Sequence, residues 1–135
     1  MTTTHWILTY AAGFVAFLAI DLLWLGVIAR SLYHSRMGDL LADAPNWPIA
    51  LLFYLLFVAG VLFFAVRPGL ASDSLGIALR NGALLGLLTY ATYDLTNLAV
   101  LRGFPAGLAF IDIGWGIVLT TSVSGAAWAV GNALR

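Results

Sequence analysis

Long apolar runs separated by short polar breaks dominate this chain of 135 residues. Four runs, at about residues 6–29, 47–66, 75–101 and 106–131, each reach the roughly 20 residues that a helix needs to cross ~30 Å of hydrocarbon. The breaks contain Pro, Gly and Arg, which are typical of helix ends. Short connections make sequential helices antiparallel. The pattern therefore predicts an all-α protein with one domain over residues 1–135, an integral membrane four-helix bundle in up-down-up-down order.

The composition fits a surface that faces lipid. Apolar residues make up 62% of the chain, the mean hydropathy is +0.99, and only 9% of residues are charged, against about 25% in a soluble domain. We therefore expect membrane lipids as partners. The formal net charge is zero, which gives no argument for a nucleic-acid partner. Cysteine is absent and no span contains histidine, so we predict no metal site, and the sequence names no cofactor.

Three aspartates interrupt the apolar runs: Asp21, Asp94 and Asp112. A carboxyl group in hydrocarbon costs roughly 2.5–3.5 kcal/mol on insertion scales, so such a residue is a candidate functional residue by default. At ~1.5 Å per helical residue, each aspartate lies about 9–13 Å from the same membrane surface. We therefore expect the three carboxyl groups to share one layer of the membrane.

Aromatic and polar residues at the same depth complete the candidate site. Trp24 and Trp115 each follow an aspartate by three residues, and the two motifs, on oppositely directed helices, resemble a small inverted repeat. Their indole groups could donate to a carboxylate, line a pocket or belong to an interfacial aromatic belt. The other candidates come from the second and third spans, and they are Tyr54, Tyr90, Tyr93 and Asn97.

Small residues recur at helical spacing on the third and fourth spans. Gly82 and Gly86 share a face of the third span, and Gly116, Thr120 and Ser124 follow one another every four residues on the fourth. Small residues at this spacing let two membrane helices approach closely. We expect these two faces to be buried between helices.

The long break over residues 30–46 has a pattern of its own. Its apolar stripe consists of Leu32, Tyr33, Met37, Leu40, Leu41 and Ala44. Two interpretations remain open. The segment forms a short interfacial helix between the first two spans, lying over the acidic layer, or it is a plain connecting loop.

Three motifs carry a resemblance to a known family: Asp21-Leu-Leu-Trp24-Leu-Gly26, the stretch from Tyr90 to Asn97, and Asp112-Ile-Gly-Trp115-Gly116. They resemble a family of small, uncharacterised four-helix proteins of the bacterial inner membrane, whose domain has no known function. The resemblance implies a multi-pass protein in that membrane. It implies no activity, cofactor or catalytic residue.

An even number of spans places both termini on one side of the membrane. The arginines do not say which side, because three lie near each surface: Arg30, Arg36 and Arg102 against Arg67, Arg80 and Arg135. We expect cytoplasmic termini, as in other small inner-membrane proteins.

Three functions remain open. Acids gathered at one depth favour binding or transport of a small molecule, a proton or a cation, and a chain of this size often needs a homodimer or another membrane partner to form a pathway. Carboxyl groups beside aromatic rings would also suit an enzyme, or a subunit of one, that acts on a lipid or isoprenoid substrate. The glycine faces fit a structural accessory subunit of a membrane complex. This third interpretation does not explain the three aspartates. We rank binding or transport first.

Overall fold

The computed structural model describes residues 1–135, which form helices and short connections without a strand. The all-α prediction is therefore confirmed. In chain order the segments are α1 (Thr3–Leu23), the π-helical turn η1 (Trp24–Ile28), α2 (Arg30–Met37), the 3₁₀ turn η2 (Gly38–Leu40), α3 (Trp47–Val61), the π-helical turn η3 (Leu62–Val66), α4 (Arg67–Ala71), α5 (Leu75–Val100) and α6 (Ala106–Leu134).

Three helical stretches are long and apolar enough to cross a membrane: Thr3–Ile28, Trp47–Ala71 and Ala106–Leu134. They correspond to the first, second and fourth predicted spans. The third predicted span, residues 75–101, forms the 26-residue helix α5 but is not among the three. Helix α5 is long enough to cross a membrane, so it is set apart from the other three by its polar side chains, which include Asp94 and Asn97.

Polar side chains start three of the long helices. Thr2, Asn46 and Ser74 each accept a hydrogen bond from the backbone N–H three residues further along, at 3.2, 3.4 and 3.1 Å respectively. Each bond satisfies one of the amide groups that the first turn of a helix leaves without a partner. These caps explain why α1, α3 and α5 begin where they do.

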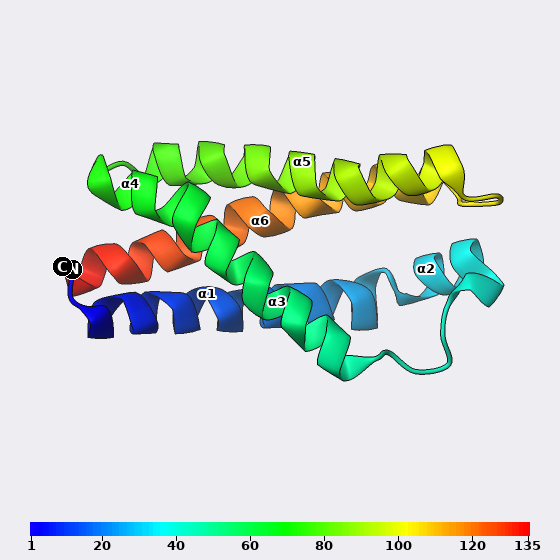
Figure 1. The fold of residues 1–135 in the computed structure, drawn as a ribbon, viewed down its shortest axis with the longest axis horizontal. Helices are drawn as coiled ribbons and strands as arrows, with labels where there is room; N and C mark the ends of the chain where they lie inside the picture. Colours follow the sequence, from blue (N-terminus) through cyan, green and yellow to red (C-terminus); the bar gives the residue numbers. More distant parts are fainter.

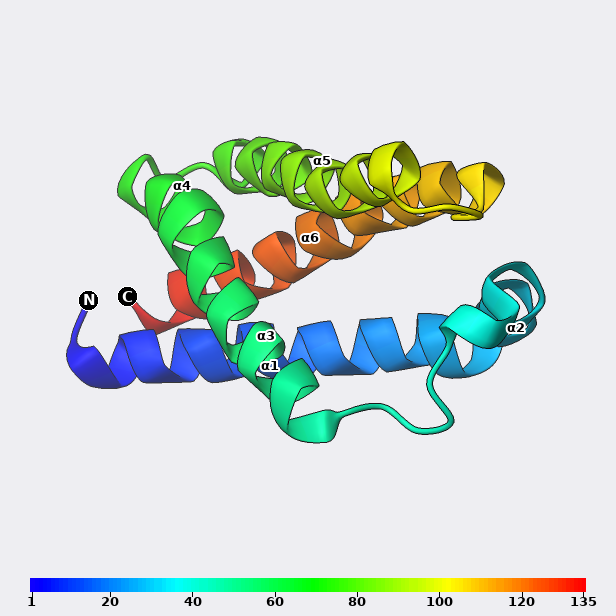
Figure 2. The same cartoon turned by 45° about the vertical axis from the view of Figure 1, so that its right-hand side comes forward.

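Helices α5 and α6 run side by side in opposite directions, and α1 packs against α6 (Figure 1). Both chain termini lie at the same end of the molecule. Helix α3 crosses α1 obliquely, as Figures 1 and 2 both show, and packs on α1 rather than on α5. Only its continuation through η3 and α4 leans against α5. This divergence separates α3 from α5 at the end of the molecule that holds α2.

The predicted small-residue faces meet between α5 and α6. A Cβ atom on Gly82 would overlap the side chain of Ser124, and one on Gly86 would overlap the backbone carbonyl of Gly116. A Cβ atom on Gly116 would in turn overlap the ring of Tyr90. The close approach of the two helices therefore depends on the absence of side chains at these glycines.

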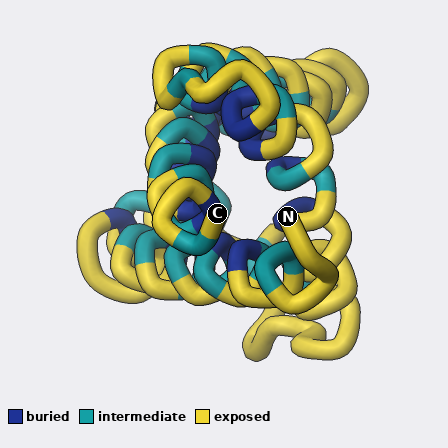
Figure 3. The backbone as a smooth tube through the Cα atoms, turned by 90° about the vertical axis from the view of Figure 1, so that its left-hand side faces the viewer, coloured by how far each residue is buried: buried dark blue, intermediate teal, exposed yellow.

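Only 27 of the 135 residues are buried, because the helices expose their outer faces. Figure 3 shows the buried positions on the sides of the helices that face one another. The core includes Phe17, Val58 and Leu119. Large apolar side chains such as Val15 and Phe63, with exposed fractions of 64% and 58%, point outward. Such a surface suits lipid and not water.

The segment over residues 30–46 is helical in its first part. Helix α2 and turn η2 together cover residues 30–40, and the remainder, up to Asn46, contains no helix. The helical interpretation of this break is therefore correct for about two thirds of it, and the loop interpretation for the rest. Helix α2 lies at the far end of the molecule from the two termini (Figure 1).

Candidate functional site

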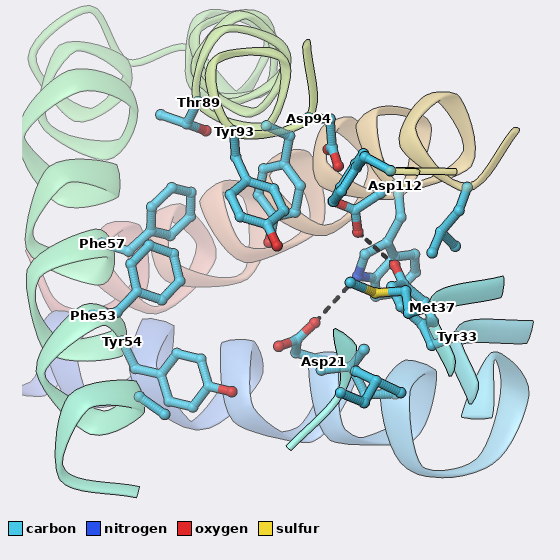
Figure 4. A pocket seen from close by; sticks show the side chains of 17 residues that line it. Asp21, Tyr33, Met37, Phe53, Tyr54, Phe57, Thr89, Tyr93, Asp94 and Asp112 are labelled. Carbon is cyan, nitrogen blue, oxygen red and sulfur yellow. Dashed lines mark hydrogen bonds between the residues drawn. The ribbon is translucent and has the colours of Figure 1, made fainter. Parts of the chain in front are cut away.

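A cavity of about 510 Å³ lies between α3 and the opposing helices α1, α5 and α6, with α2 beside it (Figure 4). Its volume is within the usual range for small-molecule sites, roughly 300–1,000 Å³. Seventeen residues line it, and thirteen of them are hydrophobic. The other four are Asp21, Thr89, Asp94 and Asp112. All three aspartates of the predicted spans therefore reach one cavity, from three different helices.

The three carboxyl groups are not equivalent. Asp94 of α5 and Asp112 of α6 lie next to each other, whereas Asp21 of α1 stands apart (Figure 4). Asp94 is 1% exposed and Asp21 is 7% exposed, and Asp112 is half-buried. The acids thus form a pair and a single group along the wall that faces α3.

Each tryptophan of the inverted motifs is linked to the aspartate of the other motif, Trp115 directly and Trp24 through Tyr33. The indole N–H of Trp115 on α6 donates to Oδ1 of Asp21 on α1 at 3.2 Å. The indole N–H of Trp24 donates to the hydroxyl oxygen of Tyr33 at 3.3 Å, and that hydroxyl donates to Oδ1 of Asp112 at 2.5 Å. The sequence predicted each tryptophan on the helix face of its own aspartate, but the indole N–H of Trp115 donates to Asp21 on α1 and that of Trp24 donates to Tyr33 on α2.

The two indole rings also stack on each other. The centroids of Trp24 and Trp115 are 4.4 Å apart and their planes differ by 8°. Trp24 opens the π-helical turn η1, so the stack forms where the first helix departs from regular α-helical geometry. Single π-helical turns inside helices are frequent at functional sites. The stacked pair and its two polar links join η1, α2 and α6 at the end of the cavity.

Tyr33 connects the short helix α2 to the acids. Burial raises the pKa of its hydroxyl group, and the hydrogen bond to Asp112 raises it further. The group therefore stays protonated at neutral pH and remains able to donate to the carboxylate. Through this bond α2 is held over the cavity.

Asp94 carries an unusual oxygen atom. Its Oδ2 is buried and has no hydrogen-bond partner. Most buried side-chain oxygens in proteins have a partner, and an unsatisfied one costs roughly 1–3 kcal/mol. Thr120 Oγ1 and Trp128 Nε1 are also buried without a partner, but of the three residues only Asp94 lines the cavity.

Seven of the nine candidate residues line the cavity, and they are Asp21, Tyr54, Tyr90, Tyr93, Asp94, Asp112 and Trp115. The other two do not. Trp24 stacks on Trp115 outside the lining, and Asn97 lies three residues beyond Asp94 on α5. No group of three or more His, Cys, Asp or Glu side chains is placed to hold a metal ion.

Several lining residues were not among the candidates. Tyr33, Met37 and Leu41 enter from the segment after the first span, and Phe53 and Phe57 from α3. The first three lie four residues apart on the apolar stripe of that segment, and this spacing could have identified them from the sequence. No sequence signal identified the two phenylalanines, because an apolar residue on a membrane helix can face either lipid or protein.

Comparison with protein families gives the context for this site. Residues 6–129 match the family described as "Predicted membrane protein (DUF2177)". The chain belongs to this family. The match spans all three motifs that carried the resemblance, and it agrees with the three apolar helices of a membrane-embedded DUF2177 protein in contact with lipid. The family description assigns no function, and comparisons with curated proteins and with solved structures gave no match.

Proposed function

We propose that this DUF2177 protein binds a small molecule in its intramembrane cavity, as one step in moving that molecule through the membrane. The observation that carries the proposal is the convergence of Asp21, Asp94 and Asp112 on one cavity, together with the unpartnered oxygen of Asp94. A carboxyl group inside a membrane is costly, and such residues mark substrate and ion pathways.

The hydrogen bonding of the three carboxyl groups supports binding more than a purely structural role. Acids that served only as packing groups would have their oxygens satisfied by neighbouring donors, as Asp21 has from Trp115 and Asp112 from Tyr33. Asp94 departs from this pattern.

In this proposal α5 is the fourth membrane span. Its 26 residues correspond to about 39 Å of helix, which exceeds the thickness of the hydrocarbon core. Asp94 and Tyr90 line the cavity and Gly82 and Gly86 meet α6, so much of its polar or small surface is turned away from lipid. The bundle would then have four helices, with both termini on the cytoplasmic side of a bacterial inner membrane.

Labelling at the two ends of α5 tests this topology. The natural chain has no cysteine, so single-cysteine variants report one position each. Ser72→Cys lies just before α5 and Arg102→Cys just after it. In intact spheroplasts a membrane-impermeant maleimide should label Arg102→Cys and leave Ser72→Cys unlabelled. Equal labelling of both positions would show that α5 does not span, and the reverse pattern would place the termini outside.

A cavity-filling substitution tests the binding function. Ala50 of α3 lines the cavity, whereas Ala59, on the same helix, is exposed and does not. The full chain in mild detergent is titrated with two molecules of the same shape, benzyltrimethylammonium and its neutral analogue neopentylbenzene. We expect at least one of them to raise the melting temperature of wild type and of Ala59→Trp but not that of Ala50→Trp.

Transport is tested by reconstitution. Wild-type protein in liposomes should accelerate uptake of whichever of the two molecules it binds, and Ala50→Trp should not. Binding without uptake would restrict the function to binding. If neither molecule stabilises wild type, or if Ala50→Trp responds like wild type, the cavity is not a binding site of this kind.

A further inference from the structure

We infer that the cavity takes an organic cation, that is, a protonated or quaternary amine attached to an apolar body. This inference rests on the proposed function and specifies its ligand. It follows from the charge of the lining, the aromatic rings around it, and the separation of the acids from the apolar wall.

The lining contains acidic groups and no basic one. Among its seventeen residues are three aspartates, and neither arginine nor histidine is present. The chain has only six basic side chains apart from its histidines, and all of them lie outside the lining. An anionic ligand would meet only like charge in a medium where screening by water is weak. A charged ligand of this cavity must therefore be positive.

Aromatic rings supply the second feature. Eight of the lining residues are aromatic, Tyr90 among them. In Figure 4, Tyr54, Phe57 and Tyr93 lie beside the space in front of the acids. The face of an aromatic ring attracts a cation, most strongly where water is excluded, and clusters of aromatic rings recognise quaternary ammonium groups. A bare metal ion gains little from such a wall, whereas an alkylated ammonium group fits it.

The cavity has an acidic side and an apolar side. Asp94 and Asp112 lie on the wall formed by α5 and α6, and Phe53 and Phe57 project from α3 on the other side (Figure 4). Trp115 and Tyr33 donate to Asp21 and Asp112, whereas Oδ2 of Asp94 has no donor, so the Asp94 carboxyl group is the one left to pair with a positive head group. The apolar body of the ligand then packs against the phenylalanines of α3.

The isosteric pair of molecules separates charge from shape. Benzyltrimethylammonium and neopentylbenzene differ in one central atom, nitrogen with a permanent charge against neutral carbon. Titration calorimetry on the full chain in non-ionic detergent should give at least tenfold tighter binding of the cation to wild type. In Asp94→Asn the ratio should fall severalfold, with binding of the neutral molecule unchanged. Partition into micelles affects wild type and variant equally, so it does not alter this comparison.

The control is Asp73→Asn, since Asp73 is exposed and follows α4, far from the lining. It should keep the wild-type ratio. If Asp94→Asn does not fold, Asp21→Asn is expected to lower the same ratio, since Asp21 also lines the cavity. Equal binding of the two molecules to wild type, or an unchanged ratio in the folded aspartate variants, would overturn the organic-cation inference and leave the cavity as a binding site for neutral molecules. Absence of binding of both molecules contradicts the proposed function itself.

Discussion

Adding one methyl group at Gly116 tests whether the seam between α5 and α6 positions the cavity. A Cβ atom there would overlap the ring of Tyr90, at atoms Cγ, Cδ1 and Cδ2. These atoms are at the base of the ring, so a rotation of the side chain end does not relieve the overlap. Gly114 provides the matched control on the same helix, because a Cβ atom there would meet nothing within 4 Å.

The two substitutions differ only in what surrounds the new methyl group. Replacing Gly with Ala inside a helix is favourable by about 0.5–1 kcal/mol. Forcing an extra group into a close-packed region costs about 1–3 kcal/mol, and this term applies to Gly116→Ala alone. We therefore expect the unfolding free energy of Gly116→Ala to lie about 2 kcal/mol below that of Gly114→Ala, a factor of roughly 30 in the equilibrium constant.

Reversible unfolding in mixed micelles with increasing dodecyl sulfate gives the unfolding free energies, with circular dichroism to follow helix loss. Because Tyr90 lines the cavity, Gly116→Ala should also weaken binding of the ligand that wild type takes, whereas Gly114→Ala should not. Equal stabilities for the two variants, or a Gly116→Ala protein more stable than wild type, would refute the argument that this glycine is required for close approach.

Four further substitutions probe individual polar groups, each measured by the same unfolding titration. Trp115→Phe keeps an aromatic ring but removes the donor to Asp21, and should cost about 1 kcal/mol; an unchanged unfolding free energy would mean that this bond adds nothing. Tyr33→Phe removes the hydroxyl that joins α2 to the acids and should cost about as much. It should also make α2 more accessible to proteolysis, and a digestion rate equal to that of wild type would show that the bond does not hold α2. Thr120→Val should be at least as stable as wild type, because its buried hydroxyl has no partner, whereas Thr121→Val loses a bond to a backbone carbonyl; a Thr120→Val variant less stable than Thr121→Val would contradict this.

The sequence alone determined the position of each group along its helix. The length of the apolar runs located the four long helical stretches, and a constant rise per residue predicted one depth for Asp21, Asp94 and Asp112. All three do line a single cavity. The seam of small residues on α5 and α6 was also readable, because glycine at helical spacing is what close approach of two membrane helices requires.

Tertiary structure decided how the helices are turned and tilted toward one another. The cavity forms because α3 crosses α1 obliquely. The sequence of α3 does not predict this crossing angle. The donation of Trp115 to the aspartate of another helix, and the link through Tyr33, likewise depend on the rotation of each helix about its axis. Lipid and a protein core are similarly apolar, so hydrophobic pattern does not distinguish the inner face of a membrane helix from its outer face, and side-chain packing makes that choice.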